Sequence, residues 1–162
     1  IGFGYRYYHN VSTHTIREEN FSVELPRSLE KATTIDYAAQ SSDGTVKANG
    51  KYADVNSDFQ YMILDYSSLA GETTDILTEK LFVTYMKGNL KSQFGSSYKE
   101  VYADGNKLKM IYRAKTGDEV YNYAICKKSG YKYYWFVFGC KADEKDFYDP
   151  KFEKWASTIH IN

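Results

Sequence analysis

The feature that most constrains the fold of this chain is a pair of apolar, tyrosine-rich runs between Glu119 and Lys141. The stretch reads EVYNYAICKKSGYKYYWFVFGCK, with Ser129-Gly130 between its halves. Aromatic and β-branched residues favour strands, and a glycine between two such runs favours a tight turn because it tolerates a positive φ. The stretch is therefore predicted to be a β-hairpin that turns at Ser129-Gly130.

Both faces of this hairpin are apolar. A two-residue turn places Lys128 opposite Tyr131 and Cys126 opposite Tyr133, and side chains then alternate between two faces. One face carries Val120, Ala124, Cys126, Tyr133, Trp135 and Val137, and the other carries Tyr121, Tyr123, Ile125, Tyr134, Phe136 and Phe138. A strand pair that is apolar on both sides is normally covered on both sides. The hairpin is therefore predicted to be central, with a layer packed on each face.

The same register separates the two cysteines of the chain. Cys140 falls opposite Glu119, and about seven residues at about 3.3 Å each separate that position from Cys126, roughly 23 Å. A disulfide needs Cα atoms within about 7 Å. Two free thiols are therefore predicted. The cysteines show no C-x-x-C or Cys/His metal spacing, so neither a metal nor a cofactor is predicted.

The composition excludes several classes of partner. The 162 residues suit one domain, and the 21 basic and 21 acidic side chains cancel. A neutral chain is not expected to bind nucleic acid or a membrane surface through bulk charge, and no apolar run approaches the roughly 18 residues of a membrane span. The start at Ile1-Gly2 leads us to expect a processed or trimmed chain, such as one that has lost a signal peptide or anchor. Together with 17 tyrosines, this favours a secreted, periplasmic or envelope-anchored setting.

The first half of the chain is predicted to contribute strands. Residues 1–20 are expected to form an N-terminal arm that precedes a single α+β domain at 21–162. Residues 21–25 alternate as a half-buried strand that ends at Pro26, residues 35–40 form a short strand, and residues 59–66 form a strong buried strand. Residues 41–56 are polar, with turn signals at Asp43-Gly44 and Asn49-Gly50, and are predicted to be a loop.

Two helices are predicted from helical spacing. The long one covers residues 73–94, capped by Thr74 or Asp75 and closed by Gly95. Its apolar stripe comprises Ile76, Leu77, Leu81, Val83, Tyr85, Met86 and Leu90. The short one begins at Asp149-Pro150, with Asp as the N-cap and Pro in the first turn. Its buried stripe is Phe152, Trp155 and Ala156, and a last short strand follows at residues 159–161.

Residues 98–115 are predicted to form a second hairpin that turns at Asp104-Gly105. Its second strand is apolar on one face and mostly basic on the other. The basic face carries Lys107, Lys109, Arg113 and Lys115. A solvated strand face is the ordinary reading of such a row, and an anionic partner site is the alternative. These four residues are the candidate partner-binding residues.

No catalytic residues are predicted. The chain has no G-x-S-x-G elbow, H-E-x-x-H motif, phosphate-binding glycine loop or Cys/His pair. The histidines His9, His14 and His160 have no cluster of metal ligands beside them in sequence and are expected to be loop or structural residues. Carboxylates that folding could bring together into an unlisted hydrolase site are Asp65, Glu79 and Asp104.

The order of elements resembles the Mog1/PsbP-like α/β/α sandwich. The resemblance rests on the opening FSVELP at residues 21–26 and on the ending Phe152…Trp155-Ala156-Ser157-Thr158-Ile159. It implies an antiparallel sheet with helices on both faces. It also implies a non-enzymatic role, since the family includes a Ran-binding protein, photosystem II extrinsic subunits and bacterial envelope lipoproteins. No binding residues are carried over, because no motif of any one branch is present.

The predicted function is therefore a non-enzymatic accessory or binding domain of a secreted or cell-envelope protein that contacts a protein partner. Tyrosine offers a large contact area with a polar tip, which suits such surfaces. One alternative is a small-ligand carrier with an aromatic-lined pocket, since the same residue types line pockets and fill cores. The other is a hydrolase without a recognisable motif.

Overall fold

The structure, a computed structural model, describes residues 12–32, 45–67 and 77–162. Its centre is a seven-stranded antiparallel sheet in the order β3-β4-β5-β9-β8-β7-β6. Its strands are β3 (Glu30–Lys31), β4 (Thr45–Ala53), β5 (Ser57–Asp65), β6 (Lys99–Asp104), β7 (Lys107–Arg113), β8 (Glu119–Ser129) and β9 (Lys132–Lys141). A smaller antiparallel sheet comprises β1 (Thr13–Arg17), β2 (Phe21–Pro26) and β10 (His160–Ile161), in the order β1-β2-β10.

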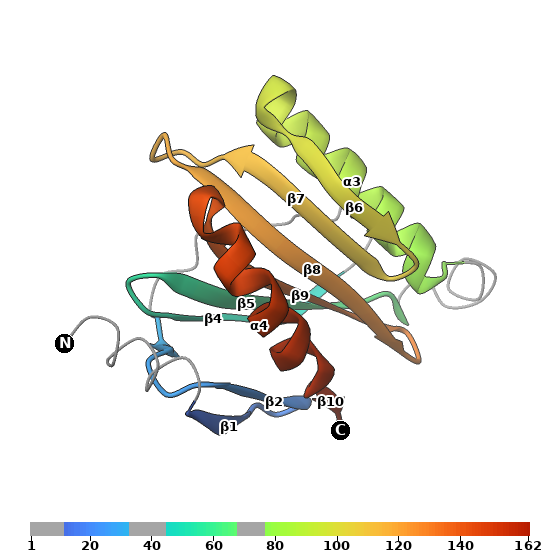
Figure 1. Cartoon of the computed structure of the whole chain (residues 1–162). Helices are drawn as coiled ribbons and strands as arrows, with labels where there is room; N and C mark the ends of the chain where they lie inside the picture. The colour runs from blue at the N-terminus through green and yellow to red at the C-terminus, as the bar shows by residue number, and fades with distance from the viewer. Residues whose placement is uncertain (1–11, 33–44, 68–76) are drawn as a thin grey trace.

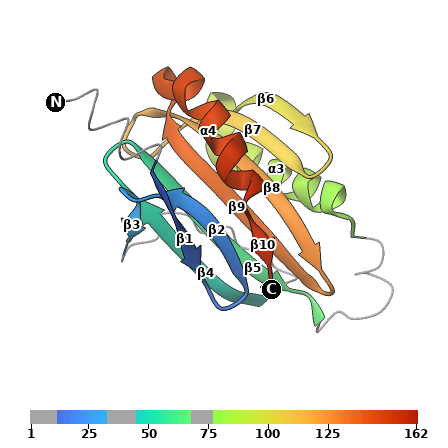
Figure 2. The ribbon, with the colours of Figure 1, turned by 60° about the horizontal axis from the view of Figure 1, so that its bottom comes forward.

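Helices cover both faces of the large sheet. Helix α3 (Glu79–Phe94) packs on one face, while α4 (Lys145–Ser157) and the small sheet pack on the other (Figures 1 and 2). Short 3₁₀ turns, η2 (Gly95–Ser97) and η3 (Ala142–Glu144), follow α3 and precede α4. This arrangement confirms the predicted α+β fold with an antiparallel sheet flanked by helices.

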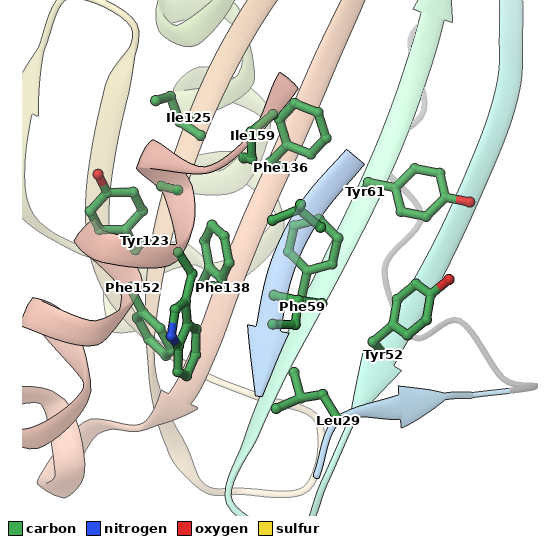
Figure 3. Packing of buried hydrophobic residues seen from close by; sticks show 14 of the residues in the cluster. Leu29, Tyr52, Phe59, Tyr61, Tyr123, Ile125, Phe136, Phe138, Phe152 and Ile159 are labelled. Carbon is green, nitrogen blue, oxygen red and sulfur yellow. The ribbon is translucent and has the colours of Figure 1, made fainter. Parts of the chain in front are cut away.

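The β8–β9 hairpin lies inside the sheet, as predicted, and both of its faces are buried. Side chains alternate along β8 and β9 between two separate hydrophobic cores. One core lies under α3, and the other lies under α4 and β2. Figure 3 shows part of the second core, where Phe59, Phe136 and Phe138 of the sheet gather near Phe152 of α4. The turn differs from the prediction: Ser129 pairs with Lys132, so Gly130, with φ of 61°, and Tyr131 form it.

The strand β4 corrects the predicted loop over residues 41–56. Residues 45–53 pair with β5 along most of their length. The neighbouring strand β5 provides the backbone hydrogen-bonding partners, although the polar sequence of residues 45–53 gives no local signal for a strand. Gly50, predicted as part of a turn, lies opposite Tyr61, and a Cβ there would come within 2.5 Å of the ring atom Cε1. The glycine therefore makes room for the tyrosine ring. The predicted strand at 35–40 and the turn at Asp43-Gly44 lie outside the described residues.

Helix α3 starts later than predicted and is rotated. Thr78 is its N-cap and accepts a hydrogen bond from the backbone N–H of Leu81, so residues 77–78 precede the helix; the caps predicted at Thr74 or Asp75 lie outside the described residues. Leu81 and Tyr85, predicted as buried, are 46% and 37% exposed. The buried stripe is Phe82, Val83, Met86 and Leu90. Phe82 fixes which side of α3 faces the sheet, because its ring stacks on that of Tyr133 with centroids 5.2 Å apart.

Helix α4 starts earlier than predicted, at Lys145, so Pro150 lies inside it. Pro150 has no N–H to donate to the backbone carbonyl of Asp146. Both residues are exposed, so water can donate a hydrogen bond to that carbonyl instead. Buried Tyr148, one turn before Phe152, extends the apolar stripe toward the N-terminus and explains the earlier start. The predicted stripe of Phe152, Trp155 and Ala156 and the closing strand, which pairs with β2, are confirmed.

The segment predicted as an N-terminal arm contributes one strand, since β1 pairs antiparallel with β2. The boundary between arm and domain at residue 21 stays a prediction. Among the helices of the described residues, none has the length and apolar character needed to cross a membrane.

Candidate functional site

Two of the four predicted partner-binding residues are held by α4. The Nζ of Lys107 lies 2.5 Å from Oε1 of Glu153, and the Nζ of Lys109 lies 3.2 Å from Oδ1 of Asp149 and 3.8 Å from Oε2 of Glu153. Both ammonium groups also lie over the ring of Tyr123, at 5.3 and 5.4 Å from its centroid. This part of the basic strand face docks α4 onto the sheet.

The contacts between β7, β8 and α4 form one electrostatic cluster. Burial raises the pKa of Glu153, but the hydrogen bond and charge of Lys107, the hydrogen bond of Tyr123 and the charge of Lys109 together outweigh it and hold that pKa below its usual range. Burial lowers the pKa of Lys107, but the hydrogen bonds and charges of Glu153 and Tyr123 together more than reverse this, so the net direction is upward. The Tyr121 hydroxyl donates to Asp149, and burial together with this bond raises the pKa of the phenol. These shifts favour a charged Glu153 and a charged Lys107 at neutral pH beside the neutral phenol of Tyr121.

The other two predicted residues, Arg113 and Lys115, border an open hollow of about 460 Å³ at the C-terminal end of α3. We call it the basic hollow. It is lined by Gln93, Phe94, Ser96, Ser97, Arg113, Ala114 and Lys115. None of these lining residues is acidic. The side chain of Arg113 is 59% exposed, and its guanidinium lies 3.5 Å from Glu119 and donates to the carbonyl of Gly117 at 3.1 Å.

Local contacts hold the basic hollow in shape. Gly95, with φ of 58°, ends α3 and lets the chain turn back toward β7. The hydroxyl of Ser97 donates to the carbonyl of Phe94 and accepts from the backbone N–H of Arg113. The ring of Phe94 stacks on that of Tyr112 with centroids 3.9 Å apart. The end of α3 is therefore attached to β7 beside Arg113.

A second hollow, of about 330 Å³, lies on the same face of the sheet between the β4–β5 and β7–β8 turns. We call it the polar hollow; Ala114 lines both hollows. Its floor includes Asp58, Gln60 and Asn122. Asn122 is only 7% exposed and accepts a 2.7 Å hydrogen bond from the Tyr112 hydroxyl. Burial, with a smaller effect of Asp58, raises the pKa of that hydroxyl.

The polar hollow depends on a pair of residues that interrupts the apolar face of the hairpin. Asn122 of β8 lies directly opposite Gly139 of β9. A Cβ at Gly139 would come within 2.5 Å of Oδ1 of Asp58 and 3.0 Å of Nδ2 of Asn122, so only a glycine leaves room for these polar groups. Our sequence reasoning did not identify this site. The sequence feature that could have indicated the polar hollow is the presence of Asn122 and Gly139 among aromatic residues on two strands predicted to be central.

The carboxylates considered for a hydrolase site, Asp65, Glu79 and Asp104, lie outside the described lining of both hollows. The carboxylates proposed to converge each have separate partners: Asp65 accepts from the N–H of Ser67, Glu79 from that of Lys128, and Asp104 from the Tyr102 hydroxyl. Within the described ranges, no group of three or more His, Cys, Asp or Glu side chains is arranged to hold a metal ion. The described lining of neither hollow includes a histidine.

Both cysteines are free and buried, as predicted, and lie in different cores on opposite faces of the sheet. Cys140 pairs with Tyr121 and not with Glu119. Burial raises the pKa of Cys126, and burial with a smaller effect of Glu144 raises that of Cys140 to about 12.

We expect neither thiol to react in the native protein. With a pKa of about 12, roughly one Cys140 thiol in 10,000 is ionised at pH 8. Dithionitrobenzoate at pH 8 should therefore titrate less than about one tenth of a thiol in the folded protein, and both thiols after unfolding in guanidinium. Rapid reaction of a native thiol would contradict the buried placement of both cysteines.

Comparisons with known proteins identify the fold. No model of a known protein family and no curated protein matches the chain. Among solved structures, the Ran-binding protein Mog1p of Saccharomyces cerevisiae matches with a TM-score of 0.57 at 8% identity, over 93% of this chain and 95% of that one. Cyanobacterial PsbP (CyanoP) of Synechocystis sp. PCC 6803 matches with a TM-score of 0.54 at 15% identity, over 93% of each chain.

The chain has a Mog1/PsbP-like fold. The predicted resemblance is thereby confirmed for the architecture. In this Mog1/PsbP-like fold, both hollows lie on the α3 face of the sheet and share the β7–β8 turn as a wall. At 8% and 15% sequence identity, the similarity establishes the fold alone and assigns no role to any residue.

Proposed function

We propose that this chain is a non-enzymatic accessory domain that binds a protein partner, and that the basic hollow contacts an acidic segment of that partner. The observation that carries the proposal is the pairing of Arg113 and Lys115 around an open hollow whose lining has no acidic side chain. Cations arranged in this way attract an acidic partner and select against a basic one.

The residue types of the basic hollow support this function. The guanidinium of Arg113 can contact a carboxylate with two N–H groups, and the ammonium of Lys115 adds a second positive charge. Half-buried Phe94 supplies apolar area beside them. One protein of the same fold is a Ran-binding protein, which supports protein binding at the level of fold analogy alone.

In this proposal the predicted basic face divides into two parts. Arg113 and Lys115 contact the partner directly. Lys107 and Lys109 hold α4 in place through Glu153 and Asp149 and act on the partner surface only through the stability of the sheet.

The proposal includes a secreted or envelope-anchored setting, which the tyrosine-rich composition favours. Fractionation of the native source, followed by detection of the chain with an antibody, tests this setting. Recovery of the chain in the cytoplasmic fraction alone would contradict it.

A small polar ligand is the second candidate, favoured by the polar hollow, whose volume of about 330 Å³ falls within the range of small-molecule sites. The predicted aromatic-lined pocket finds no support, because the aromatic side chains pack against one another in the two cores. Native mass spectrometry of the chain recovered from its source distinguishes the candidates. A small added mass favours the ligand, and an added protein mass favours the partner.

We expect the double substitution Arg113→Glu with Lys115→Glu to abolish capture of the partner. Two reversed charges at an acidic contact should weaken binding by at least about tenfold, since each replaces attraction by repulsion. The measurement is cross-linking of the tagged domain in its native source, mass-spectrometric identification of the captured protein, and titration of that purified protein by calorimetry.

The matched control is Lys80→Glu with Lys154→Glu. It changes the net charge by the same amount at two exposed helical positions that do not line the basic hollow. Equal affinity of the control and wild-type proteins, with loss only in the Arg113/Lys115 variant, supports the site. Equal affinity of all three proteins removes the basic hollow from the interface.

A further inference from the structure

Strand β6 is the edge of the large sheet among the described strands, and α3 reaches it near one end, where Nζ of Lys87 lies 2.9 Å from Oε1 of Glu100. All six of its residues are exposed. Helix α3 packs over β7 and β8, and α4 packs over β8 and β9. Figures 1 and 2 show β6 as the last of the described strands on its side of the sheet. One side of this strand therefore presents unpaired backbone groups to a strand from outside.

The two ends of β6 carry opposite charges. Its sequence is KEVYAD, with Lys99 at one end and Asp104 at the other. The two central residues, Val101 and Tyr102, are large and 42% and 45% exposed. Tyr102 is held in place, because the Nζ of Lys109 lies 5.4 Å from its ring centroid and its hydroxyl donates to Asp104 at 3.3 Å.

We propose that β6 pairs antiparallel with β6 of a second copy of this chain, around a two-fold axis between Val101 and Tyr102. In that register Lys99 of each copy lies opposite Asp104 of the other. Val101 lies opposite Tyr102, and Glu100 lies opposite Ala103. Both charged ends of the strand are then neutralised, and the exposed apolar centre is covered, by a single self-complementary contact.

The pairing of β6 with β7 is consistent with this register. Lys99 and Asp104 both lie opposite odd-numbered residues of β7, Ile111 and Lys107, so they belong to the same face of the sheet and can meet across the two-fold axis. Glu100 and Ala103 lie opposite Met110 and Leu108, on the other face. Opposed residues of two antiparallel strands must share a face, and the Lys99–Asp104 and Glu100–Ala103 pairs satisfy that condition.

The bulge in β6 lies at the centre of the proposed contact. The register with β7 shifts between Glu100 and Tyr102, so Val101 has no partner on β7. A bulge and terminal charges usually protect an edge strand against arbitrary pairing. Here a parallel copy would bring Lys99 against Lys99, and a foreign strand without matching charges would leave Lys99 and Asp104 unpaired. The edge is therefore selective for its own antiparallel copy.

The interface is small, so the dimer should be weak. A pair of six-residue strands buries less than the roughly 1,600 Å² of a standard interface, which points to a dissociation constant on the order of 100 µM. This self-association is independent of the proposed partner site, since Arg113 and Lys115 do not belong to β6.

The test is analytical ultracentrifugation of the full chain from about 5 to about 500 µM, a range that brackets the expected dissociation constant. Wild type should shift from monomer to dimer across this range. Lys99→Asp places aspartate at both ends of the strand, and Asp104→Lys places lysine at both ends. Each variant alone should dimerise at least about tenfold more weakly, because like charges then face each other.

Mixing the two variants decides between a β6 contact and any other interface. Lys99→Asp and Asp104→Lys chains present opposite charges to each other, so their equimolar mixture should form a heterodimer of about wild-type affinity. Lys80→Asp, at an exposed site on α3, is the control and should dimerise like wild type. A wild type that stays monomeric overturns the proposal. So does a dimer that is indifferent to both charge reversals, which would place the interface elsewhere.

Discussion

Replacing Phe138 with alanine should lower the free energy of unfolding by about 3–5 kcal/mol. Phe138 is fully buried, and its ring centroid lies 5.0 Å from that of Phe59 and 5.6 Å from that of Phe152. It also contacts the rings of Tyr123 and Trp155. The side chain therefore joins β5, β8 and α4, and its removal leaves a cavity that none of them can fill alone.

The effect is large relative to the whole stability of a domain of this size, which is typically about 5–15 kcal/mol. Urea unfolding followed by tryptophan fluorescence measures it. Phe147→Ala is the matched control, because Phe147 is 41% exposed and should cost less than about 1 kcal/mol. A loss below about 1 kcal/mol for Phe138→Ala would contradict the packing of α4 on the sheet.

Asp149→Ala should lower the free energy of unfolding by about 1–3 kcal/mol. The substitution leaves the fully buried Tyr121 without the acceptor of its hydroxyl and removes the nearer carboxylate of Lys109. The cost arises chiefly from buried polar groups that lose their partners. Asp146→Ala, in the first turn of the same helix and fully exposed, is the control and should cost less than about 1 kcal/mol.

A double-mutant cycle with Tyr121→Phe identifies the cause of that loss. If the orphaned hydroxyl is responsible, Asp149→Ala should cost about 1 kcal/mol less in the Tyr121→Phe background than in wild type. Strictly additive effects would show that the hydroxyl and carboxylate are not coupled. The attachment of α4 would then rest on its apolar stripe alone.

The two-sided hairpin was predictable from the sequence even though its turn was placed incorrectly. The structure moves the turn from Ser129-Gly130 to Gly130-Tyr131, which shifts the pairing by two residues. Because side chains alternate with a period of two, a shift of two changes each partner but moves no side chain to the other face. The predicted faces therefore match the two cores at every residue except Val120, which is half-buried and lines the polar hollow.

Strand β4 was not predictable in the same way. Its polar residues and its Asn49-Gly50 pair carry the local signals of a loop, and it becomes a strand because β5 lies beside it. The role of Gly50 appears only when the ring of Tyr61 is placed opposite it. Strand formation in such a segment depends on the neighbouring strand more than on intrinsic preference.

The candidate site was predicted only in part, for an electrostatic reason. The sequence pointed to the four cations of the basic face but not to which of them are neutralised. Lys107 and Lys109 meet carboxylates of α4 more than 35 residues away in the chain. Arg113 instead meets Glu119 of the neighbouring strand and, together with Lys115, borders a hollow whose described lining has no acidic residue. Charge pairing at such separations depends on how α4 crosses the sheet.

The sequence by itself determined the features that alternate or repeat locally: the central hairpin with two apolar faces, the opening strand at Phe21, the free thiols and the α+β class. These follow from periodicity and local turn chemistry, which act over a few residues. Only the tertiary structure decided which cations meet the carboxylates of α4, where Asn122 meets Gly139, and that, among the described strands, β6 pairs on one side only. Each of these depends on contacts between segments distant in the chain, for which a single sequence carries no local signal.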